Sequence, residues 1–155
     1  MKQYIIRLFN YSHWANELIL EVLEKNKLND EYILKMLSHI LNAQYIWLAR
    51  INPKFVHNVQ LWDVHNMDVI KEMNETISTL YIEFVAKQKL SAFNNKYDNT
   101  NLKGEKFATA LADILIHVAN HNAHHRGQIS LKIRELGVEP PNFNYITYAR
   151  SFNIW

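Results

Sequence analysis

The chain has no cysteine and few of the residues that interrupt regular structure. Its 155 residues include three glycines and three prolines. The lack of cysteine excludes disulfide bonds, thiolate metal ligands and a cysteine nucleophile supplied by the protein itself. Folds built from many strands and tight turns use more glycine and proline than this chain contains. The scarcity of both residues therefore favours long helices.

Charge and hydropathy exclude two further classes of protein. Seventeen Lys and Arg residues against fifteen Asp and Glu residues give a net charge of +2, with the two signs interspersed. No basic footprint for nucleic acid stands out, and no apolar run approaches the length of a membrane span. The opening MKQYIIRLFNYSHWANELIL lacks the cleavage site of a signal peptide. We therefore expect a cytoplasmic protein that binds neither nucleic acid nor membrane.

Apolar residues recur at three- and four-residue steps in four segments, which predicts four amphipathic helices. The predicted helices are one that ends near Lys25, one from an N-cap at Asp30 to just before Pro53, one over about 66–90, and one from near Glu105 to a C-cap at Gly137. Each is long enough to pack along its neighbours over several turns.

The segments between the predicted helices complete the fold. Residues 52–66 form a long connection between the second and third helices, in which Trp62 is the expected anchor. A short hairpin is expected around Tyr97, and a short helical turn is expected over 142–150. Four long helices in a chain of this size predict an all-α fold, a four-helix bundle that forms one domain over residues 1–155.

The stretch HVANHNAHHRGQI, residues 117–129, holds four of the eight histidines. On a helix with about 100° per residue, His121 and His125 fall one turn apart within an apolar stripe. His117 and His124 fall at its edge. We therefore expect His121 and His125 to face the bundle core, close enough to share a metal ion. The stripe is formed by Phe107, Leu111, Ile114, Val118, Ile129 and Leu136.

Two interpretations of the inward pair remain open at this point. A divalent metal would satisfy both imidazoles, whose polar atoms are costly to bury without a partner. Alternatively, both are core histidines that bond to the backbone or to Tyr and Asn side chains. The pair is not part of an HExxH motif, because Asn122 occupies the position of the glutamate. A zinc protease of that type is therefore disfavoured.

A site with two histidines needs a third ligand, and His39 on the second helix is the best candidate. Its helical neighbours form a second apolar flank, which indicates a helix that lies between others. Alternatively, His39 is a rim residue beside polar neighbours. His13 is a weaker candidate, and His57 and His65 lie in the predicted long connection. The flank consists of Tyr32, Met36, Ala43 and Ile46.

Three segments of the chain resemble the DinB/YfiT-like superfamily. They are NYSHWANELIL, LSHILNAQYIWLAR with its single His39, and HVANHNAHHRGQI followed by LKIRELGVEPPNFNYITYAR. The resemblance covers nearly the whole chain, and it implies a four-helix bundle that is often paired as a homodimer. It also implies that His39, His121 and His125 hold a divalent metal ion such as Zn, Ni or Fe. These are the three histidines that the periodicity favours.

The residues that follow His125 raise further expectations. Asn144 stands where the family often has Asp, and if that acid normally pairs with Arg126, the pairing here is weaker. Apart from that pairing, we expect Arg126 to be a surface or dimer-contact charge. Gly127 is expected to let another helix approach, and Gln128 to form hydrogen bonds near the histidines.

Three neutral imidazoles leave a divalent ion with at least one open position, which is typical of catalytic more than of structural sites. Imidazole suits Zn²⁺, Ni²⁺, Fe²⁺ and Cu²⁺ alike, so the ligands do not select the metal. A water or a thiol at the open position would lose its proton more readily and become the reacting group. His117, His124 and Gln128 are candidates to assist it.

The reaction has three interpretations. We favour transfer of a low-molecular-weight thiol to a small electrophile, because characterised relatives use bacillithiol or mycothiol in this way and the chain has no cysteine of its own. The second is hydrolysis of a small amide or ester. It usually needs a carboxylate base, and neither Glu105 nor Asp113 lies beside His121 on the predicted helix. The third is a stress-associated metal-binding bundle without turnover.

Overall fold

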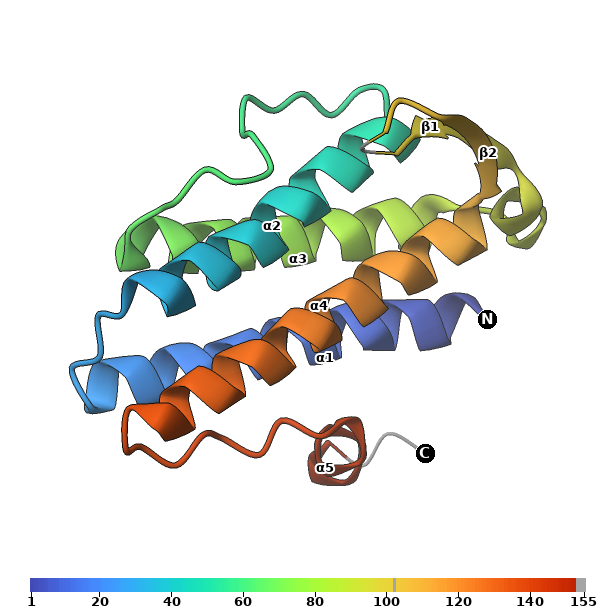
Figure 1. Ribbon diagram of the computed structural model, residues 1–155. Coiled ribbons are helices and arrows are strands. Elements are labelled where there is room, and N and C mark those ends of the chain that lie inside the picture. The colour runs from blue at the N-terminus through green and yellow to red at the C-terminus, as the bar shows by residue number, and fades with distance from the viewer. Residues whose placement is uncertain (102, 153–155) are drawn as a thin grey trace.

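The computed structural model describes residues 1–101 and 103–152, and Figure 1 shows the helices and the hairpin of this part of the chain. The elements are α1 Lys2–Lys25, α2 Glu31–Ile51, α3 Met67–Lys87, a 3₁₀ turn Leu90–Asn94, β1 Lys96–Thr100, β2 Lys106–Ala110, α4 Leu111–Glu135 and α5 Tyr145–Ser151. The predicted all-α bundle is confirmed, with the small hairpin as an addition at one end.

Capping residues explain where several helices begin and end. The Asp30 side chain accepts a hydrogen bond from the backbone N–H of Ile33 at 3.1 Å, so the predicted N-cap of α2 is confirmed. Asn66 caps α3 in the same way. Helix α4 ends at Glu135, and Gly137 follows with a φ of +80°, a left-handed conformation that glycine adopts without strain.

The four long helices pack as two layers. Helix α1 packs mainly against α3, and α2 packs mainly against α4. Helices α2 and α3 run in the same direction, opposite to α1 and α4 (Figure 1). The chain must therefore return along the whole of α2, which is about 31 Å long, before α3 begins. The connection 52–66 has the necessary reach, since an extended chain of its length spans about 50 Å.

Buried side chains from all four long helices form one core. Phe9 of α1 stacks on Tyr81 of α3 with ring centroids 4.2 Å apart, and the Tyr81 hydroxyl donates to the carbonyl oxygen of Gln44 at 2.9 Å. A fully buried side chain of this size stabilises the fold by about 2 kcal/mol. The other large residues of the core include Ile19, Leu20, Leu23, Ile33, Leu37, Ile40, Leu41 and Leu48.

The predicted start of the fourth helix was wrong by several residues. Residues 106–110, KFATA, form β2 and pair antiparallel with β1, with Tyr97 opposite Thr109. The predicted hairpin around Tyr97 therefore exists, and α4 begins only at Leu111, whose backbone N–H donates to the Asn95 carbonyl. Phe107 consequently lies on a half-exposed strand and not in the helical stripe. A β-branched and aromatic pairing across the strands outweighed the helical spacing.

Polar side chains of α2 fasten the long connection to the bundle. The Asn42 side chain donates to the Asp63 carbonyl at 2.8 Å and accepts from the His65 ring at 2.8 Å. The backbone N–H of His65 donates to the Ser38 hydroxyl at 2.9 Å. In Figure 1 the connection arches over α2 before α3 begins. Its final residues are thereby held close to His39.

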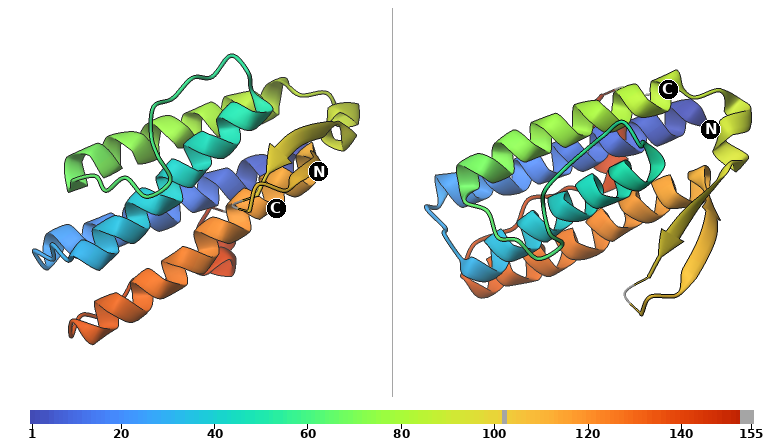
Figure 2. Two further views of the ribbon diagram at one scale, coloured as in Figure 1. Left: turned by 45° about the horizontal axis from the view of Figure 1, so that its top comes forward. Right: turned by 90° about the horizontal axis from the view of Figure 1, so that it is seen from above.

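The C-terminal segment covers α1. Tyr148 of α5 contacts the rings of Tyr11 and Trp14, with centroids 5.7 and 5.3 Å away. Figure 1 shows α5 outside the four long helices, and Figure 2 shows the hairpin of β1 and β2 projecting from one end of the bundle. The predicted short helical turn near the end of the chain is confirmed as α5. Over the described residues, the helices lack an apolar stretch long enough to traverse a lipid bilayer.

Candidate metal centre

Three histidine rings from two helices converge at the interface of α2 and α4. The Nε2 atom of His121 lies 3.2 Å from that of His39 and 3.1 Å from that of His125. One ligand atom from each ring lies within 4.8 Å of the others. A tetrahedral ion with bonds of 2.0–2.1 Å separates its nitrogen ligands by about 3.3 Å. The cluster could therefore bind a metal ion with little movement of the rings.

Hydrogen bonds at the opposite nitrogens orient two of these rings. The Nδ1 atom of His39 donates to the Leu61 carbonyl oxygen at 3.2 Å, because a carbonyl can only accept. The Nδ1 atom of His125 donates to the Gln128 side-chain oxygen at 2.7 Å. Each donation leaves the Nε2 lone pair free to face the common point. Partners of this kind set the tautomer of metal-binding histidines and hold the ring in position.

The long connection also covers His39. The Trp62 ring stacks on the His39 ring with centroids 3.9 Å apart and planes 15° apart, and the Lys35 ammonium lies 5.4 Å from the Trp62 centroid. His39 itself is buried, so it lies within the bundle and not on its rim. The expected anchoring role of Trp62 is thus seen as a contact with the cluster. Spacing alone gave no sign of this partner, because Trp62 lies outside any helix.

The environment keeps the histidines in the form that binds metal. Burial first, and then the neighbouring imidazoles with His125 foremost among them, lower the pKa of His121 to about 3. Burial also lowers the pKa of His39, against the opposing effect of its bond to Leu61. Both rings are therefore neutral at pH 7, and a neutral imidazole nitrogen has the lone pair that a metal ligand requires.

The rotation of α4 differs from the sequence prediction. His121 and His125 are half-buried and lie beside the most buried face of α4, not in its centre. Leu136, which the predicted stripe included, is 39% exposed. Two polar residues, Asn122 and Arg126, occupy the centre of the buried face instead. The full buried face consists of Leu111, Ile114, Leu115, Val118, Asn122, Arg126, Ile129 and Ile133.

The other histidines do not join the converging group, although the ring centroids of His117 and His124 lie 6.0 Å from His121 and 5.1 Å from His125. His117 is exposed and packs edge-on against Trp47, and His124 is exposed and lies 3.4 Å from the Gln128 side-chain nitrogen. His13 lies between α1 and α3, and His65 bonds to Asn42 in the connection. Among the described residues, the group that could hold a metal consists of the three predicted histidines alone.

Arg126 contradicts its predicted place on the surface. Its side chain is fully buried, and its Nη1 atom donates to the Ser12 hydroxyl at 3.0 Å and to the Asn16 side-chain oxygen at 3.3 Å. Asn144 is exposed, and its amide donates to Asn142 at 2.9 Å. Within the described contacts, the expected pairing of Arg126 with residue 144 does not occur. The spacing of Arg126 to the apolar residues three and seven positions later could have indicated its burial.

The two residues after Arg126 differ in their surroundings. Gly127 is exposed, and a Cβ atom added to it would meet no described atom within 4 Å. No helix of the described chain therefore uses Gly127 for a close approach. Gln128 bonds to His125, as its predicted place near the histidines requires.

A groove begins where Gln128 reaches the surface. It has a volume of about 410 Å³ and is lined by Tyr32, Gln128, Leu131, Lys132 and Glu135. Gln128 is also the residue that orients His125. The groove therefore lies beside Gln128, the partner of His125, although none of the three histidines lines it, and it is large enough for part of a small molecule.

Comparison with known proteins places the chain among relatives. A model of the DinB family matches residues 1–153. The uncharacterised protein YizA of Bacillus subtilis is 30% identical, over 86% of this chain and 83% of YizA. Protein DinB of Bacillus subtilis is 26% identical, over 96% of this chain and 95% of that protein.

A solved structure shares the fold. The crystal structure of a DinB-like protein from Bacillus cereus ATCC 10987 matches with a TM-score of 0.71 at 19% identity, over 89% of this chain and 94% of that one. The resemblance drawn from the histidine segments is confirmed by the match along almost the whole sequence. The chain belongs to the DinB family.

Proposed function

We propose that this protein is a metal-dependent enzyme that activates a low-molecular-weight thiol, of the bacillithiol or mycothiol type, for transfer to a small electrophile. Its divalent ion would be held by His39, His121 and His125. The observation that carries the proposal is the convergence of three Nε2 atoms on one point. Hydrogen bonds from the opposite Nδ1 atoms to Leu61 and Gln128 orient two of the rings towards that point.

The residues of the chain have separate roles in this proposal. A divalent ion, when bound, supplies a positive charge that favours the thiolate form of a thiol beside it. Leu61 and Gln128 orient His39 and His125, and Trp62 shields the His39 ring from water. The reaction forms a sulfur–carbon bond, breaks the bond from carbon to the leaving group, and releases the thiol proton to solvent.

The chemistry of the ligand group favours thiol transfer over hydrolysis. Among the described residues, the converging group contains three imidazoles and no carboxylate. Asp113 is exposed in the first turn of α4, and Glu105 lies outside the helix, so neither has become a neighbour of His121. Hydrolysis of an amide or ester usually needs a base within hydrogen-bond reach of the attacking water. A thiol brings its own nucleophile and needs only activation and positioning.

The groove supports an enzyme over a bundle that only binds metal. It adjoins the cluster through Gln128, and it combines the apolar surfaces of Tyr32 and Leu131 with the charges of Lys132 and Glu135. A small amphipathic thiol or electrophile could lie there, one side chain away from His125. A metal site of purely structural use has no need of such a space beside it.

Metal content is the first test. Untagged wild-type protein is compared with His39→Ala and His121→Ala by elemental mass spectrometry, and His57→Ala serves as the control for the loss of one histidine elsewhere. We expect near one equivalent of a divalent metal in wild type and in the control, and less than a tenth of it in the two cluster variants. No stoichiometric metal in wild type after reconstitution with Zn²⁺ or Ni²⁺ would overturn the proposal.

Thiol transfer is the second test. Metal-loaded wild type is mixed with bacillithiol or mycothiol and a chloroalkyl probe that becomes fluorescent when the thioether forms. We expect thioether formation with wild type and none with His121→Ala. We also expect no hydrolysis of a nitrophenyl ester or anilide by wild type. Turnover of the ester or anilide without thiol would instead assign a hydrolase. A full metal load with neither reaction across a range of substrates would favour the non-catalytic bundle.

The predicted homodimer also belongs to this proposal. One ridge of α4 is exposed along its length and carries small or apolar side chains, among which Ile116 is 45% and Leu131 is 58% exposed. Such a ridge could pack closely against a second copy, with Gly127 near its centre. The ridge consists of Ile116, Asn120, Ala123, Gly127 and Leu131. Light scattering should show a dimer that Ala123→Glu converts to a monomer while the metal content is unchanged.

A further inference from the structure

Arg126 is a buried cation without a direct counter-ion. Its guanidinium is fully buried, and its described hydrogen-bond partners are the neutral side chains of Ser12 and Asn16. The aromatic rings of Tyr11 and Phe143 lie 5.2 and 6.0 Å from it. No described carboxylate forms an ion pair with it. A buried charge is costly unless other groups supply compensating charge or dipoles.

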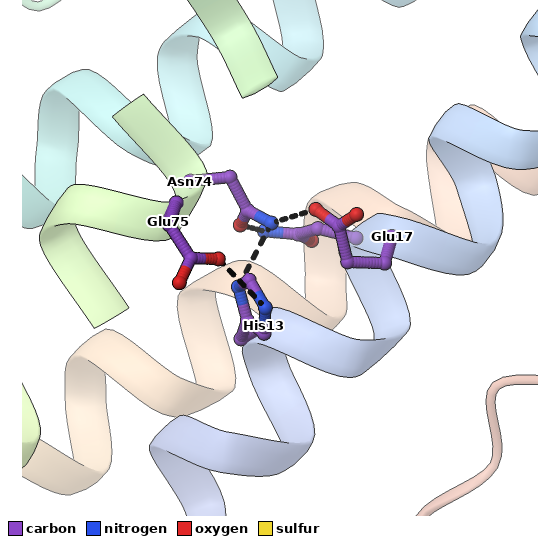
Figure 3. Close-up of polar contacts among 5 residues, drawn as sticks. His13, Glu17, Asn74 and Glu75 are labelled. Carbon is purple, nitrogen blue, oxygen red and sulfur yellow. Dashed lines mark hydrogen bonds and ion pairs between the residues drawn. The ribbon is translucent and has the colours of Figure 1, made fainter. Parts of the chain in front are cut away.

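A chain of side-chain amides connects this cation to a carboxylate on the far side of α1. The Asn16 oxygen accepts from Arg126, and the Asn16 nitrogen donates to the Asn74 oxygen at 2.9 Å. The Asn74 nitrogen then donates to the Glu17 carboxylate at 2.6 Å, as Figure 3 shows. Asn16 and Asn74 are buried, and Glu17 is half-buried. The path therefore crosses the α1–α3 interface from the core towards solvent.

Every donor in this chain points in the same direction. Each amide presents its oxygen towards Arg126 and its nitrogen towards Glu17, so both dipoles are aligned with the field between the two charges. Hydrogen bonds aligned in this way strengthen one another in a medium of low dielectric constant. The alignment also excludes a flipped amide, because reversing either one would place two oxygens or two nitrogens together.

A side branch anchors the same amide. The second hydrogen of the Asn74 nitrogen faces Nδ1 of His13 at 3.0 Å, and Nε2 of His13 lies 3.4 Å from the Glu75 carboxylate (Figure 3). All the hydrogen-bonding atoms of the Asn74 side chain are thus occupied. The His13 ring and the two carboxylates do not converge on one point, and in the described chain they are no second metal group.

We propose that Glu17, acting through Asn74 and Asn16, is the counter-charge of Arg126, and that this chain is a positioning device for the metal ligands of α4. The second part rests on the proposed metal-dependent function. Arg126 directly follows His125, and its bonds to α1 fix the rotation of α4 about its axis. That rotation decides whether His121 and His125 face His39. Glu17 is accordingly a positioning residue that contacts neither the metal nor the substrate.

The experiment compares Glu17→Gln with Glu21→Gln. Both changes remove one negative charge from α1 and keep the side-chain shape, but Glu21 is exposed one turn further along the helix and forms no described hydrogen bond or ion pair. The thermal midpoint of the metal-free protein and the Zn²⁺ affinity, from competition with a chromophoric chelator, are both measured. We expect Glu17→Gln to lower the midpoint by several degrees and to weaken Zn²⁺ binding about 10-fold, while Glu21→Gln changes neither.

A rescue variant completes the test. Asn16→Asp places a carboxylate in direct contact with Arg126, and the Asn74 amide then reverses to donate to its second oxygen, so the distant counter-charge becomes dispensable. In the Asn16→Asp background, Glu17→Gln should change the midpoint and the Zn²⁺ affinity by less than a third of its effect in wild type. This non-additivity is the signature of coupling, which an independent surface charge does not produce.

The outcomes separate the parts of the proposal. Equal effects of Glu17→Gln and Glu21→Gln, or an undiminished effect in the Asn16→Asp background, would overturn the counter-charge. A lowered midpoint with unchanged Zn²⁺ affinity would overturn the positioning role. If wild type binds no Zn²⁺ while the midpoints follow the expected pattern, the proposed function fails together with the positioning role, and the counter-charge stands.

Discussion

The two polar clusters on either side of α4 have opposite chemistry. Between α4 and α2, three histidine rings bring ligand nitrogens to one point. Between α4 and α1, Arg126 is a cation that donates from Nη1 to Ser12 and Asn16, and within the described chain its Nε and Nη2 atoms have no partner. The first cluster has electron pairs for a cation, whereas the second contains its cation from the start. The comparison indicates that the side of α4 facing α2 is suited to binding a cation, whereas the side facing α1 is suited to holding the helix in place.

Removal of Arg126 should cause the largest effect. Arg126→Ala leaves a cavity and removes the donor to the Asn16 side-chain oxygen, so we expect a loss of about 3–5 kcal/mol in the free energy of unfolding. Arg134→Ala, an exposed arginine two turns later, is the control and should cost less than about 0.5 kcal/mol. Urea denaturation of the metal-free proteins measures both. Equal losses in the two variants would show that buried Arg126 contributes no more to stability than an exposed arginine of the same helix.

Metal should stabilise the histidine side by a smaller amount. An ion that binds only the folded state contributes about 2.7 kcal/mol when its free concentration is 100 times Kd. We expect Zn²⁺ at that excess to raise the thermal midpoint of wild type, and a chelator to reverse the rise. In His121→Ala the rise should vanish. A rise of equal size in that variant would show that the ion binds elsewhere.

Loss of the partner of His125 should weaken metal binding without removing it. Gln128→Leu keeps the volume of the side chain but removes the oxygen that accepts from Nδ1 of His125. We expect a 10- to 100-fold increase in the Kd for Zn²⁺, measured by competition with a chelator, and an unchanged unfolding curve without metal. The matched change Arg134→Leu is the control, since Arg134 is exposed on the same helix and contacts neither histidine. An unchanged Kd in Gln128→Leu would show that the orientation of the ring is set by packing alone.

The smallest expected effect is on the pH dependence of stability. In the folded protein the pKa of His121 is lowered to about 3, below its usual value near 6.5, so in this interval the unfolded chain binds more protons. Stability of the metal-free protein should therefore be fully present above pH 6.5 and decrease as the pH falls towards 3. His121→Asn should flatten the slope between pH 6.5 and 5, measured by urea denaturation at each pH. A slope identical to that of wild type would contradict this account, and His124→Asn controls for the loss of an exposed histidine.

Much of the fold and of the histidine cluster could be predicted from local patterns. Helical spacing located α1, α2 and α3 and the cap at Asp30, because these signals lie within one or two turns of the chain. The same spacing placed His121 and His125 one turn apart and selected His39 as their partner. The start of α4 and the exposure of Leu136 could not be predicted, because the pairing of β1 with β2 competes with the helix only once the strands meet.

The sequence by itself determined which histidines are the candidates to bind a metal, since donor type and helical spacing are properties of the chain alone. Only the tertiary structure decided how α4 is rotated, and with it that Arg126 is buried while the histidines stand at the edge of the core. The rotation depends on hydrogen bonds between residues more than fifty positions apart, from Arg126 to Ser12 and from Asn16 to Asn74. Contacts at such separations leave no periodic trace in a sequence, because each partner is specified independently. Trp62 on His39 is a second example, since a loop residue reaches its partner only after the whole connection has folded over α2.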